Sequence, residues 1–238
     1  MITFSNVYKK FDKYEVLKGI NLEFKEGNII GLIGPNASGK TTLIKSLLGM
    51  VIPSSGEIQF MGKSIQKDWA YRNHIGYMPQ IGKYPENMTI GQVFEMIEDL
   101  RGQKQEIDNE LFKRYNLGTL LNKRMGTLSG GTRQKVSAHL AFMFDPKVLV
   151  LDEPTAGLDP LSSMILKEKI IKERENGKLI LISSHILSEL DDIVNHIVFL
   201  EEGKIIVNKP IEELKRDTGK NKLSESIAVL MSNSNKQY

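Results

Sequence analysis

The residues with the clearest chemistry stand in the stretch GPNASGKT, from Gly34 to Thr41. It matches the pattern G-x-x-x-x-G-K-[ST] between a short apolar run and a helical apolar stripe. Glycines let backbone N–H groups wrap phosphates at a helix start, where the helix dipole adds attraction. Lys40 would reach the β- and γ-phosphates, and Thr41 would hold Mg²⁺. A turn without ligand is the weaker alternative. The predicted nucleoside triphosphate site comprises Gly34, Pro35, Asn36, Ala37, Ser38, Gly39, Lys40, Thr41 and Thr42.

Two adjacent carboxylates follow a second apolar run, in the stretch KVLVLDEP. Asp152 and Glu153 stand where a buried strand would end, and ligands of parallel sheets bind at that edge. Phosphoryl transfer needs a carboxylate for the metal ion and a group that orients water. We predict that Asp152 binds Mg²⁺, mostly through its water shell, and that Glu153 polarises the attacking water. A solvated strand end is the alternative, and the phosphate loop in the same chain disfavours it.

Two further polar residues are candidates for the same chemistry. Gln80, in YMPQ, stands where a helical segment begins, and its amide oxygen could contact the metal ion or the water. His185, in LISSHIL, follows another apolar run and is a candidate to contact the γ-phosphate. A lone histidine is more often structural than catalytic. On spacing alone both assignments stay open.

A second anion-binding motif stands far along the chain from the first. The stretch LSGGTRQK starts with a serine and two glycines and continues as a helix-forming run. Ser129, Gly130 and Gly131 therefore have the composition of an anion-binding helix start. Further on, Asp159 before Pro160 indicates a helix N-cap. A chain of this size has no evident need for two phosphate sites.

Composition excludes several classes of protein. The chain has 238 residues, a net charge of +3 and no cysteine, so it has neither a disulfide framework nor a thiolate metal site. The small, dispersed charge argues against nucleic acid as a partner and against a polybasic membrane anchor. The N-terminal stretch lacks the apolar core of a secretion signal. No window reaches the roughly 18 apolar residues of a spanning helix, so we expect no membrane crossing by this chain.

Hydrophobic periodicity indicates the elements that must position these residues. The segment up to residue 33 alternates as strands, and GEIQFMGK returns to that pattern and is expected to join them. The segment 81–145 differs, because Thr89 and Gln92 form a T-x-x-Q capping box before an apolar stripe. We interpret this segment as an inserted helical subdomain.

The last third of the chain alternates between strands and helices. Short apolar strands separated by helices are typical of a parallel sheet covered on both faces. ILSELDDIVN is expected to form one of these helices, and IEELKRD another. The polar tail, 218–238, is expected either to fray or to dock through SIAVLM.

Together these motifs resemble the ATP-binding subunit of ABC transporters, over about residues 2–215. Six motifs occur in the order of that family: GPNASGKTT, Gln80, LSGGTRQK, VLVLDEP, AGLDP and His185. The resemblance implies an α/β fold, with a P-loop NTPase (RecA-like) core, an antiparallel β-subdomain and an inserted helical subdomain. It implies one ABC ATP-binding domain over residues 2–217, and an ATPase that uses ATP and Mg²⁺.

The resemblance also explains the second anion motif. In this family two subunits pack head to tail, and the LSGG segment of one closes over the γ-phosphate held by the other. Ser129, Gly130 and Gly131 would thus complete the partner's site, and Asp159 would lie at the same interface. Thr132 stands where glutamine is usual, and we expect closure over ATP to survive that change. Gln80 would serve as a metal ligand.

The aromatic residue that stacks on adenine is usually a tyrosine in this family. The matching position here is Phe11, and Tyr8 and Tyr14 stand close by. Plain packing of Phe11 is the competing interpretation.

The family's partners are membrane proteins. The resemblance implies a multispanning membrane permease subunit, with a second copy of this chain or a homologous ATPase subunit. The chain would then be cytoplasmic and peripheral on the inner face of the cell membrane. The alternative is a soluble ABC-type ATPase that remodels a ribosome or DNA complex. Such proteins carry two cassettes or a long coiled coil, whereas this chain has one cassette and no heptad run.

A narrower resemblance concerns YRNHIGYMPQIGKYPENMTIGQVFEMIEDLRG together with LSGGTRQKVSA. These stretches look like the ATPase of the copper-processing ABC system that matures nitrous-oxide reductase. The chain has no cysteine and four scattered histidines, none at metal-ligand spacing. Any copper specificity would therefore lie in its partners.

Overall fold

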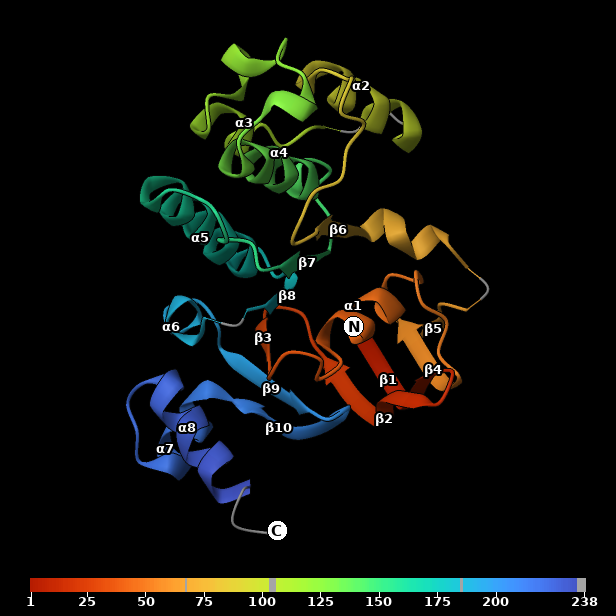
Figure 1. The fold of residues 1–238 in the computed structure, drawn as a ribbon, viewed down its shortest axis with the longest axis vertical. Helices are drawn as coiled ribbons and strands as arrows, with labels where there is room; N and C mark the ends of the chain where they lie inside the picture. Colours follow the sequence, from red (N-terminus) through yellow and green to blue (C-terminus); the bar gives the residue numbers. More distant parts are fainter. Residues whose placement is uncertain (67, 103–105, 185, 235–238) are drawn as a thin grey trace. The chain divides into compact units, whose positions relative to one another are not determined.

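The chain folds into two compact units (Figure 1). The first unit comprises residues 1–71 and 181–238, and the second comprises residues 72–180. The structure is a computed structural model that describes residues 1–66, 68–102, 106–184 and 186–234.

The first unit contains an antiparallel sheet in the order β2-β1-β4-β5. Its strands are β1 Ile2–Phe11, β2 Tyr14–Phe24, β4 Ser55–Phe60 and β5 Lys63–Ser64. Alternate residues at the start of β1 are buried, and the ring of Phe4 packs edge-on against Phe24 with centroids 5.8 Å apart. This period of two is that of a strand with one face in the core. The expectation that GEIQFMGK joins the opening strands is confirmed, because β4 pairs with β1.

A second set of strands in the first unit has the order β10-β9-β3. Its bounds are β3 Ile29–Ile33, β9 His196–Glu201 and β10 Lys204–Pro210. β3 and β9 are parallel, and every residue of β3 is buried, as its continuous apolar sequence predicts. The helix α1, Lys40–Leu47, follows β3 after the glycine-rich loop. A hairpin turn at Glu202–Gly203 joins β9 to β10.

The second unit combines parallel strands with helices. The strands β6, Ile75–Met78, and β7, Val148–Asp152, pair in parallel, and every residue of β7 is buried. The capping box is confirmed: Thr89 Oγ1 accepts the Gln92 N–H at 3.2 Å, and Gln92 Oε1 accepts the Thr89 N–H at 2.9 Å. The bounds are η1 Ala70–His74, β6 Ile75–Met78, α2 Ile90–Arg101, α3 Glu110–Arg114, η2 Leu117–Leu120, η3 Met125–Thr127, α4 Gly130–Phe142, β7 Val148–Asp152, α5 Pro160–Glu175 and β8 Leu179–Ser183. The chain passes back into the first unit within β8.

One expected helix is shorter than its sequence suggested. ILSELDDIVN forms only the short helix α6, Leu187–Leu190. The N–H groups of Ile193 and Val194 both donate to the carbonyl of Leu190, so the chain turns there and does not continue the helix. The apolar periodicity of this stretch reflects burial of Ile193 and Val194 after the turn.

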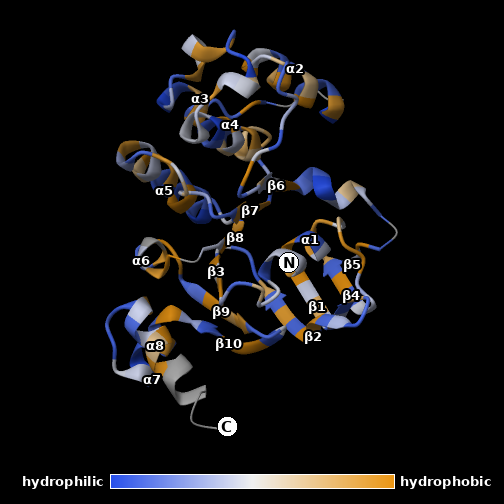
Figure 2. Cartoon of the chain, viewed as in Figure 1, coloured by the Kyte–Doolittle hydropathy of each residue, from blue (hydrophilic) through white to orange (hydrophobic). Residues whose placement is uncertain are grey.

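The C-terminal tail docks on the first unit, which was one of the two expected alternatives. After α7, Ile211–Thr218, the chain forms α8, Leu223–Ser234. Leu223 and Ile227 are buried, and Figure 2 shows apolar residues along α8. The Leu223 N–H donates to both carboxylate oxygens of Asp191 at 3.1 Å, so an acidic side chain caps the start of this helix. The frayed alternative is wrong for the described part of the tail.

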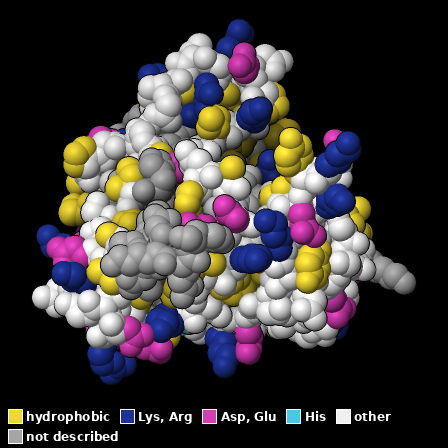
Figure 3. Space-filling view, turned by 60° about the horizontal axis from the view of Figure 1, so that its bottom comes forward, with side chains coloured by type: hydrophobic (Ala, Val, Ile, Leu, Met, Phe, Trp, Pro, Cys, Tyr) yellow, Lys and Arg dark blue, Asp and Glu magenta, His cyan; other side chains and the backbone are white. Residues whose placement is uncertain are grey.

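The surface carries mixed charges. On the face drawn in Figure 3, Lys and Arg side chains are interspersed with Asp and Glu side chains. Within the part of the chain that the structure describes, no helix is both long enough and apolar enough to cross a bilayer.

Candidate nucleotide-binding and hydrolysis site

The phosphate loop lies in the first unit between β3 and α1. Gly34 has φ 152°, and a Cβ there would lie 2.0 Å from the carbonyl oxygen of Leu200, so a larger residue would displace backbone. Lys40 Nζ donates to the carbonyl oxygens of Gly34 at 2.7 Å and Pro35 at 2.8 Å. The ammonium group of Lys40 therefore points back over the loop.

The chemistry of the loop fits a bound phosphate. Gly39 is the N-cap of α1 and provides no side-chain cap, and the first turn of α1 has no acidic residue. The start of α1 therefore keeps its partial positive charge for an anion. Ser38 Oγ is buried and has no hydrogen-bond partner among the described residues. Thr41 follows Lys40 in the first turn of α1.

Phe11 lies on the same hairpin that contacts the phosphate loop. Phe11 is 46% exposed, so it does not belong to the buried core. Lys9 Nζ lies 4.7 Å from the ring centroid, so one face of the ring is occupied by a cation. Lys9 Nζ also donates to the carbonyl of Ile52 at 2.8 Å. Tyr8 is 39% exposed and Tyr14 is 80% exposed.

The carboxylate pair lies in the second unit at the end of β7. Asp152 is the last residue of β7 and is only 9% exposed. Burial, together with the nearby Asp152 carboxylate, raises the pKa of Tyr77 on β6. Glu153 has φ 49°, a backbone conformation that is costly for a non-glycine residue and that turns it out of the strand.

Gln80 and Glu153 are brought together by the structure. Gln80 Nε2 donates to Glu153 Oε2 at 2.8 Å, although 73 residues separate them in the chain. From the helix α4, which follows the serine–glycine motif, Gln134 Nε2 donates to the carbonyl oxygens of Glu153 and Pro154, each at 3.4 Å. Gln80 and the helix α4 therefore both contact the loop that follows β7.

The serine–glycine motif forms a helix start, as predicted. Ser129 is the N-cap of α4, and its Oγ accepts the Thr132 N–H at 3.3 Å. Ser129 Oγ also lies 2.9 Å from Thr132 Oγ1. The unusual threonine therefore bonds to the capping serine, and Gly130 and Gly131 form the first turn of α4, which has no acidic residue.

Asp159 is the N-cap of α5 and also forms an ion pair with a residue of α4. Its Oδ1 accepts the Ser162 N–H at 2.8 Å at the start of α5. Its Oδ2 lies 2.9 Å from Lys135 Nζ on α4. The hydrogen bonds from Lys135 and Ser162 hold the pKa of Asp159 well below its usual range. Asp159 therefore stays ionised and ties α5 to α4.

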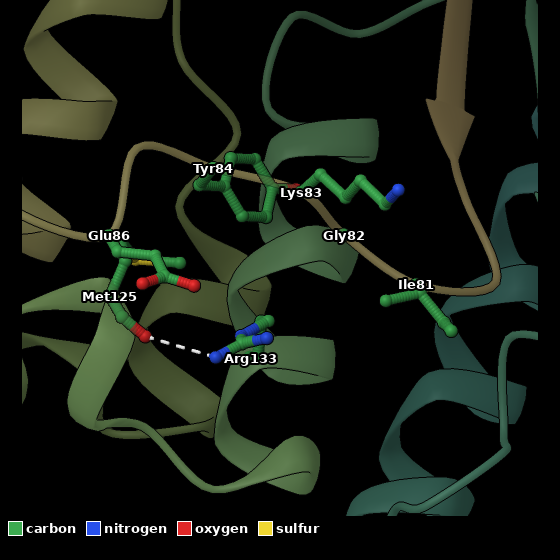
Figure 4. Close-up of a pocket in the computed structure, with 7 residues that line it drawn as sticks. All are labelled: Ile81, Gly82, Lys83, Tyr84, Glu86, Met125 and Arg133. Carbon is green, nitrogen blue, oxygen red and sulfur yellow. Dashed lines mark hydrogen bonds between the residues drawn. The ribbon is translucent and has the colours of Figure 1, made fainter.

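A pocket lies directly after Gln80 in the second unit. Figure 4 shows the side chains around it, which come from the segment after β6, from η3 and from α4. Its volume is about 310 Å³, and Arg133 on α4 donates to the carbonyl of Met125 at 3.3 Å. The lining residues are Ile81, Gly82, Lys83, Tyr84, Glu86, Met125 and Arg133.

Each unit thus holds one set of the predicted residues. The first unit holds Phe11 and the stretch from Gly34 to Thr42, and the second holds Gln80, Asp152, Glu153, Ser129, Gly130, Gly131 and Asp159. His185 lies outside the described residues, and its assignment stays a prediction. Sequence reasoning missed Gln134 and Lys135. Both stand within the LSGGTRQK stretch, but no pattern in that stretch predicts what they contact.

A comparison with known protein families assigns the chain to a family. The family described as ABC transporter matches residues 17–156 of the chain. The chain belongs to the ABC transporter family. It is an ATP-binding domain of that family, and its enzyme class is therefore ATPase, as predicted.

Relatives and a solved structure are similar over most of the chain. The uncharacterized ABC transporter ATP-binding protein YhaQ of Bacillus subtilis (strain 168) is 34% identical over 225 residues, which cover 92% of this chain and 74% of YhaQ. The lantibiotic transport ATP-binding protein SrtF of Streptococcus pyogenes is 33% identical over 211 residues, 88% of this chain and 90% of SrtF. A solved structure of an ATP-binding subunit of an ABC transporter has a TM-score of 0.90 at 26% identity, covering 97% of this chain and 99% of that one. The predicted fold class is confirmed.

Proposed function

We propose that the chain binds ATP with Mg²⁺ at the phosphate loop and hydrolyses it to power a membrane transporter. Lys40 binds the β- and γ-phosphates, and Thr41, Asp152 and Gln80 provide the oxygens that would hold the metal ion. Mg²⁺, when bound, neutralises charge on the transferred phosphoryl group. Glu153 accepts a proton from the attacking water and orients it. The exposed Phe11 ring offers a platform for the adenine.

The observation that carries this proposal is the hydrogen bond between Gln80 and Glu153 at 2.8 Å. The proposed water-activating carboxylate is held by the residue that immediately precedes the pocket. Ile81 to Tyr84 line that pocket, so a partner seated in it would shift the backbone next to Gln80. A shift of Gln80 would release or restore the carboxylate of Glu153. Partner binding and hydrolysis would then be linked by a single side-chain contact.

We propose that the second anion-binding helix start serves another copy of the chain or a homologous subunit. The start of α4 has Ser129 and two glycines and no acidic residue in its first turn, so it favours an anion. In a head-to-tail pair with twofold symmetry, each chain contributes its phosphate loop to one site and its α4 helix start to the other. ATP then joins the two chains, and hydrolysis releases them. The ionised Asp159 would lie at this interface.

The partner is proposed to be a multispanning permease, which places the chain on the cytoplasmic face of the membrane. The names of YhaQ and SrtF both refer to transport, which supports a transporter over the soluble alternative that acts on ribosomes or DNA. The pocket after Gln80 is the proposed docking site. Its lining mixes apolar side chains with Lys83, Glu86 and Arg133, which suits an amphipathic helix of the permease.

The copper-related role stays a prediction. Neither YhaQ nor SrtF is named for copper or for nitrous oxide. The described residues contain no group of three or more histidine, acidic or cysteine residues that could hold a metal ion. The proposed domain boundaries, 2–217 with the helical subdomain at 81–145, also stay as stated.

The test is purification of the tagged chain from detergent-solubilised membranes of its host, with mass spectrometry of the proteins that accompany it. We expect a stoichiometric multispanning protein with the wild-type chain and much less of it with Lys83→Glu, which inverts a charge in the pocket. Lys123→Glu is the matched control, because Lys123 is exposed and does not line the pocket. Recovery of ribosomal proteins, or of no membrane protein, would contradict the transporter assignment. Equal recovery with both variants would contradict the docking site.

A further inference from the structure

The turn between β9 and β10 braces two parts of the first unit. The Gly203 N–H donates to the carbonyl of Ser38 in the phosphate loop at 3.0 Å. The Gly203 carbonyl accepts the Lys18 N–H of β2 at 2.8 Å. One residue thus bonds on one side to the loop that would hold the phosphates and on the other side to β2. β2 forms a hairpin with β1, and Phe11 stands at the end of that hairpin opposite Tyr14.

The backbone of Gly203 also packs closely against the backbone of β2. A Cβ at Gly203 would lie 2.4 Å from the carbonyl oxygen of Val16. The same carbonyl oxygen lies 2.9 Å from where a Cβ would stand on Gly39. The Val16 carbonyl therefore fits between the turn and the phosphate loop, with no room for a side chain on either.

Val16 stands at an irregularity of β2. Lys9 pairs with Leu17, whereas its neighbour Lys10 pairs with Glu15, so β2 has one extra residue there. The bulge directs this part of β2 toward the loop and the turn. From the bulge the hairpin runs on to Phe11. The position of the bulge against Gly203 thus fixes where Phe11 stands relative to the phosphate loop.

We propose that Gly203 is a positioning residue that sets the separation between the Phe11 ring and the phosphate loop, and so sets the affinity for the base of the nucleotide. This inference rests on the proposed binding of ATP at the phosphate loop. A Cβ at Gly203 would push β2 away from the loop and move Phe11 with it. The phosphate contacts belong to the loop itself and would stay.

The test compares the binding of two probes, ATP and inorganic tripolyphosphate, by isothermal titration calorimetry. For Gly203→Ala we expect the Kd for ATP to rise by about tenfold, since stacking on one aromatic ring accounts for that order of affinity. We expect the Kd for tripolyphosphate, which has no base, to change less than about twofold. In a Phe11→Ala background the same substitution is expected to leave ATP affinity unchanged, because no ring remains to be displaced.

Gly62→Ala is the matched control. Gly62 ends the tight turn between β4 and β5 with φ 77°, close to the φ 79° of Gly203, and a Cβ there would meet nothing within 4 Å. Both substitutions therefore carry the same backbone strain, and only one carries the collision. We expect Gly62→Ala to bind both probes like the wild type.

Several results would overturn the inference. An equal loss for ATP and tripolyphosphate would show that the turn supports only the phosphate loop, and no loss for either would show that it positions nothing. Persistence of the full effect in the Phe11→Ala background would also contradict it. If wild type binds neither probe, the proposed function itself fails. Should Gly203→Ala not fold, Gly203→Asn keeps the added Cβ in a residue that tolerates positive φ better.

Discussion

Single side chains carry the chemical part of the proposed function. The contact between Gln80 and Glu153 joins two residues that the sequence marks separately, one before the helical segment and one after a buried strand. Residue types and spacing predict which groups would take part in the chemistry. They could not predict this contact, because 73 residues lie between its partners and only tertiary folding sets their distance. The pairing of Lys135 with Asp159 escaped prediction for the same reason.

Lys40 provides the most direct test of the phosphate loop. Its ammonium group lies over the loop, bonded to the carbonyls of Gly34 and Pro35. Lys40→Ala removes the charged hydrogen bonds to phosphate, and we expect ATP affinity to fall by at least about tenfold. Lys45→Ala is the control on the last turn of the same helix. Undiminished ATP affinity of Lys40→Ala in a calorimetric titration would contradict the assignment of the loop.

His139 predicts a pH dependence of stability. It is buried on α4 with ring centroids 5.0 Å from Phe94 and 5.5 Å from Phe112. Burial lowers its pKa to about 4, although the charge of Asp108 opposes this. The folded state therefore favours neutral His139. Its contribution is complete above the unfolded pKa of about 6.5 and is lost as pH falls toward 4.

The corresponding experiment compares urea unfolding at pH 7.5 and pH 5. Between these values the wild type should lose about 2 kcal/mol more unfolding free energy than His139→Leu, which has no group to protonate. The comparison uses the change with pH and not the absolute stability, so repacking around the leucine does not obscure it. Equal losses in both proteins would show that His139 does not titrate in this range.

At the scale of elements, α5 is held to the segment around α3 by a buried ammonium group. Lys169 is 2% exposed, and its Nζ lies 2.5 Å from Asp108 Oδ2, 3.0 Å from Glu110 Oε2 and 2.7 Å from Glu173 Oε1. Burial alone would lower the pKa of Lys169, but the hydrogen bonds to these three carboxylates raise it. Such a group is fully charged at neutral pH and depends on all its partners.

Removing this ammonium group should destabilise the second unit strongly. Lys169→Met removes the cation shared by the buried Glu173 and the partly exposed Asp108 and Glu110, and we expect the free energy of unfolding to fall by about 3 kcal/mol or more. Lys172→Met is the control, because Lys172 also contacts Glu110 but is 57% exposed, and its loss should cost less than about 1 kcal/mol. Similar effects of the two substitutions in urea unfolding would contradict the role of the buried group.

Most elements could be predicted from hydrophobic period and capping residues. The Thr89–Gln92 box and the Asp159–Pro160 start are local signals, and the structure has both. The length of α6 could not be predicted from such signals. Its apolar residues have helical spacing, yet Ile193 and Val194 are buried by a turn, which sequence period alone cannot distinguish from a helix. The start of α8 is capped by Asp191, which lies in a distant segment. The sequence of α8 alone therefore does not show whether this helix forms.

For the whole molecule, we propose that ATP joins two chains head to tail. The fold and family are established by the match over residues 17–156 and by the solved cassette with a TM-score of 0.90. The claim explains why one chain has two helix starts suited to anions, at α1 and at α4. The proposal also distinguishes two steps. Joining the two chains needs the contacts to phosphate, whereas separating them needs hydrolysis and therefore Glu153.

The mass in solution of Glu153→Gln with saturating ATP and Mg²⁺ shows whether ATP joins two chains. The substitution keeps the size of the side chain but removes the base, so closure should survive while hydrolysis stops. We predict that light scattering after size exclusion gives a dimer with ATP and a monomer without it, and that adding Lys40→Ala abolishes the dimer. A Glu153→Gln chain that stays monomeric at saturating ATP and Mg²⁺ would contradict the account.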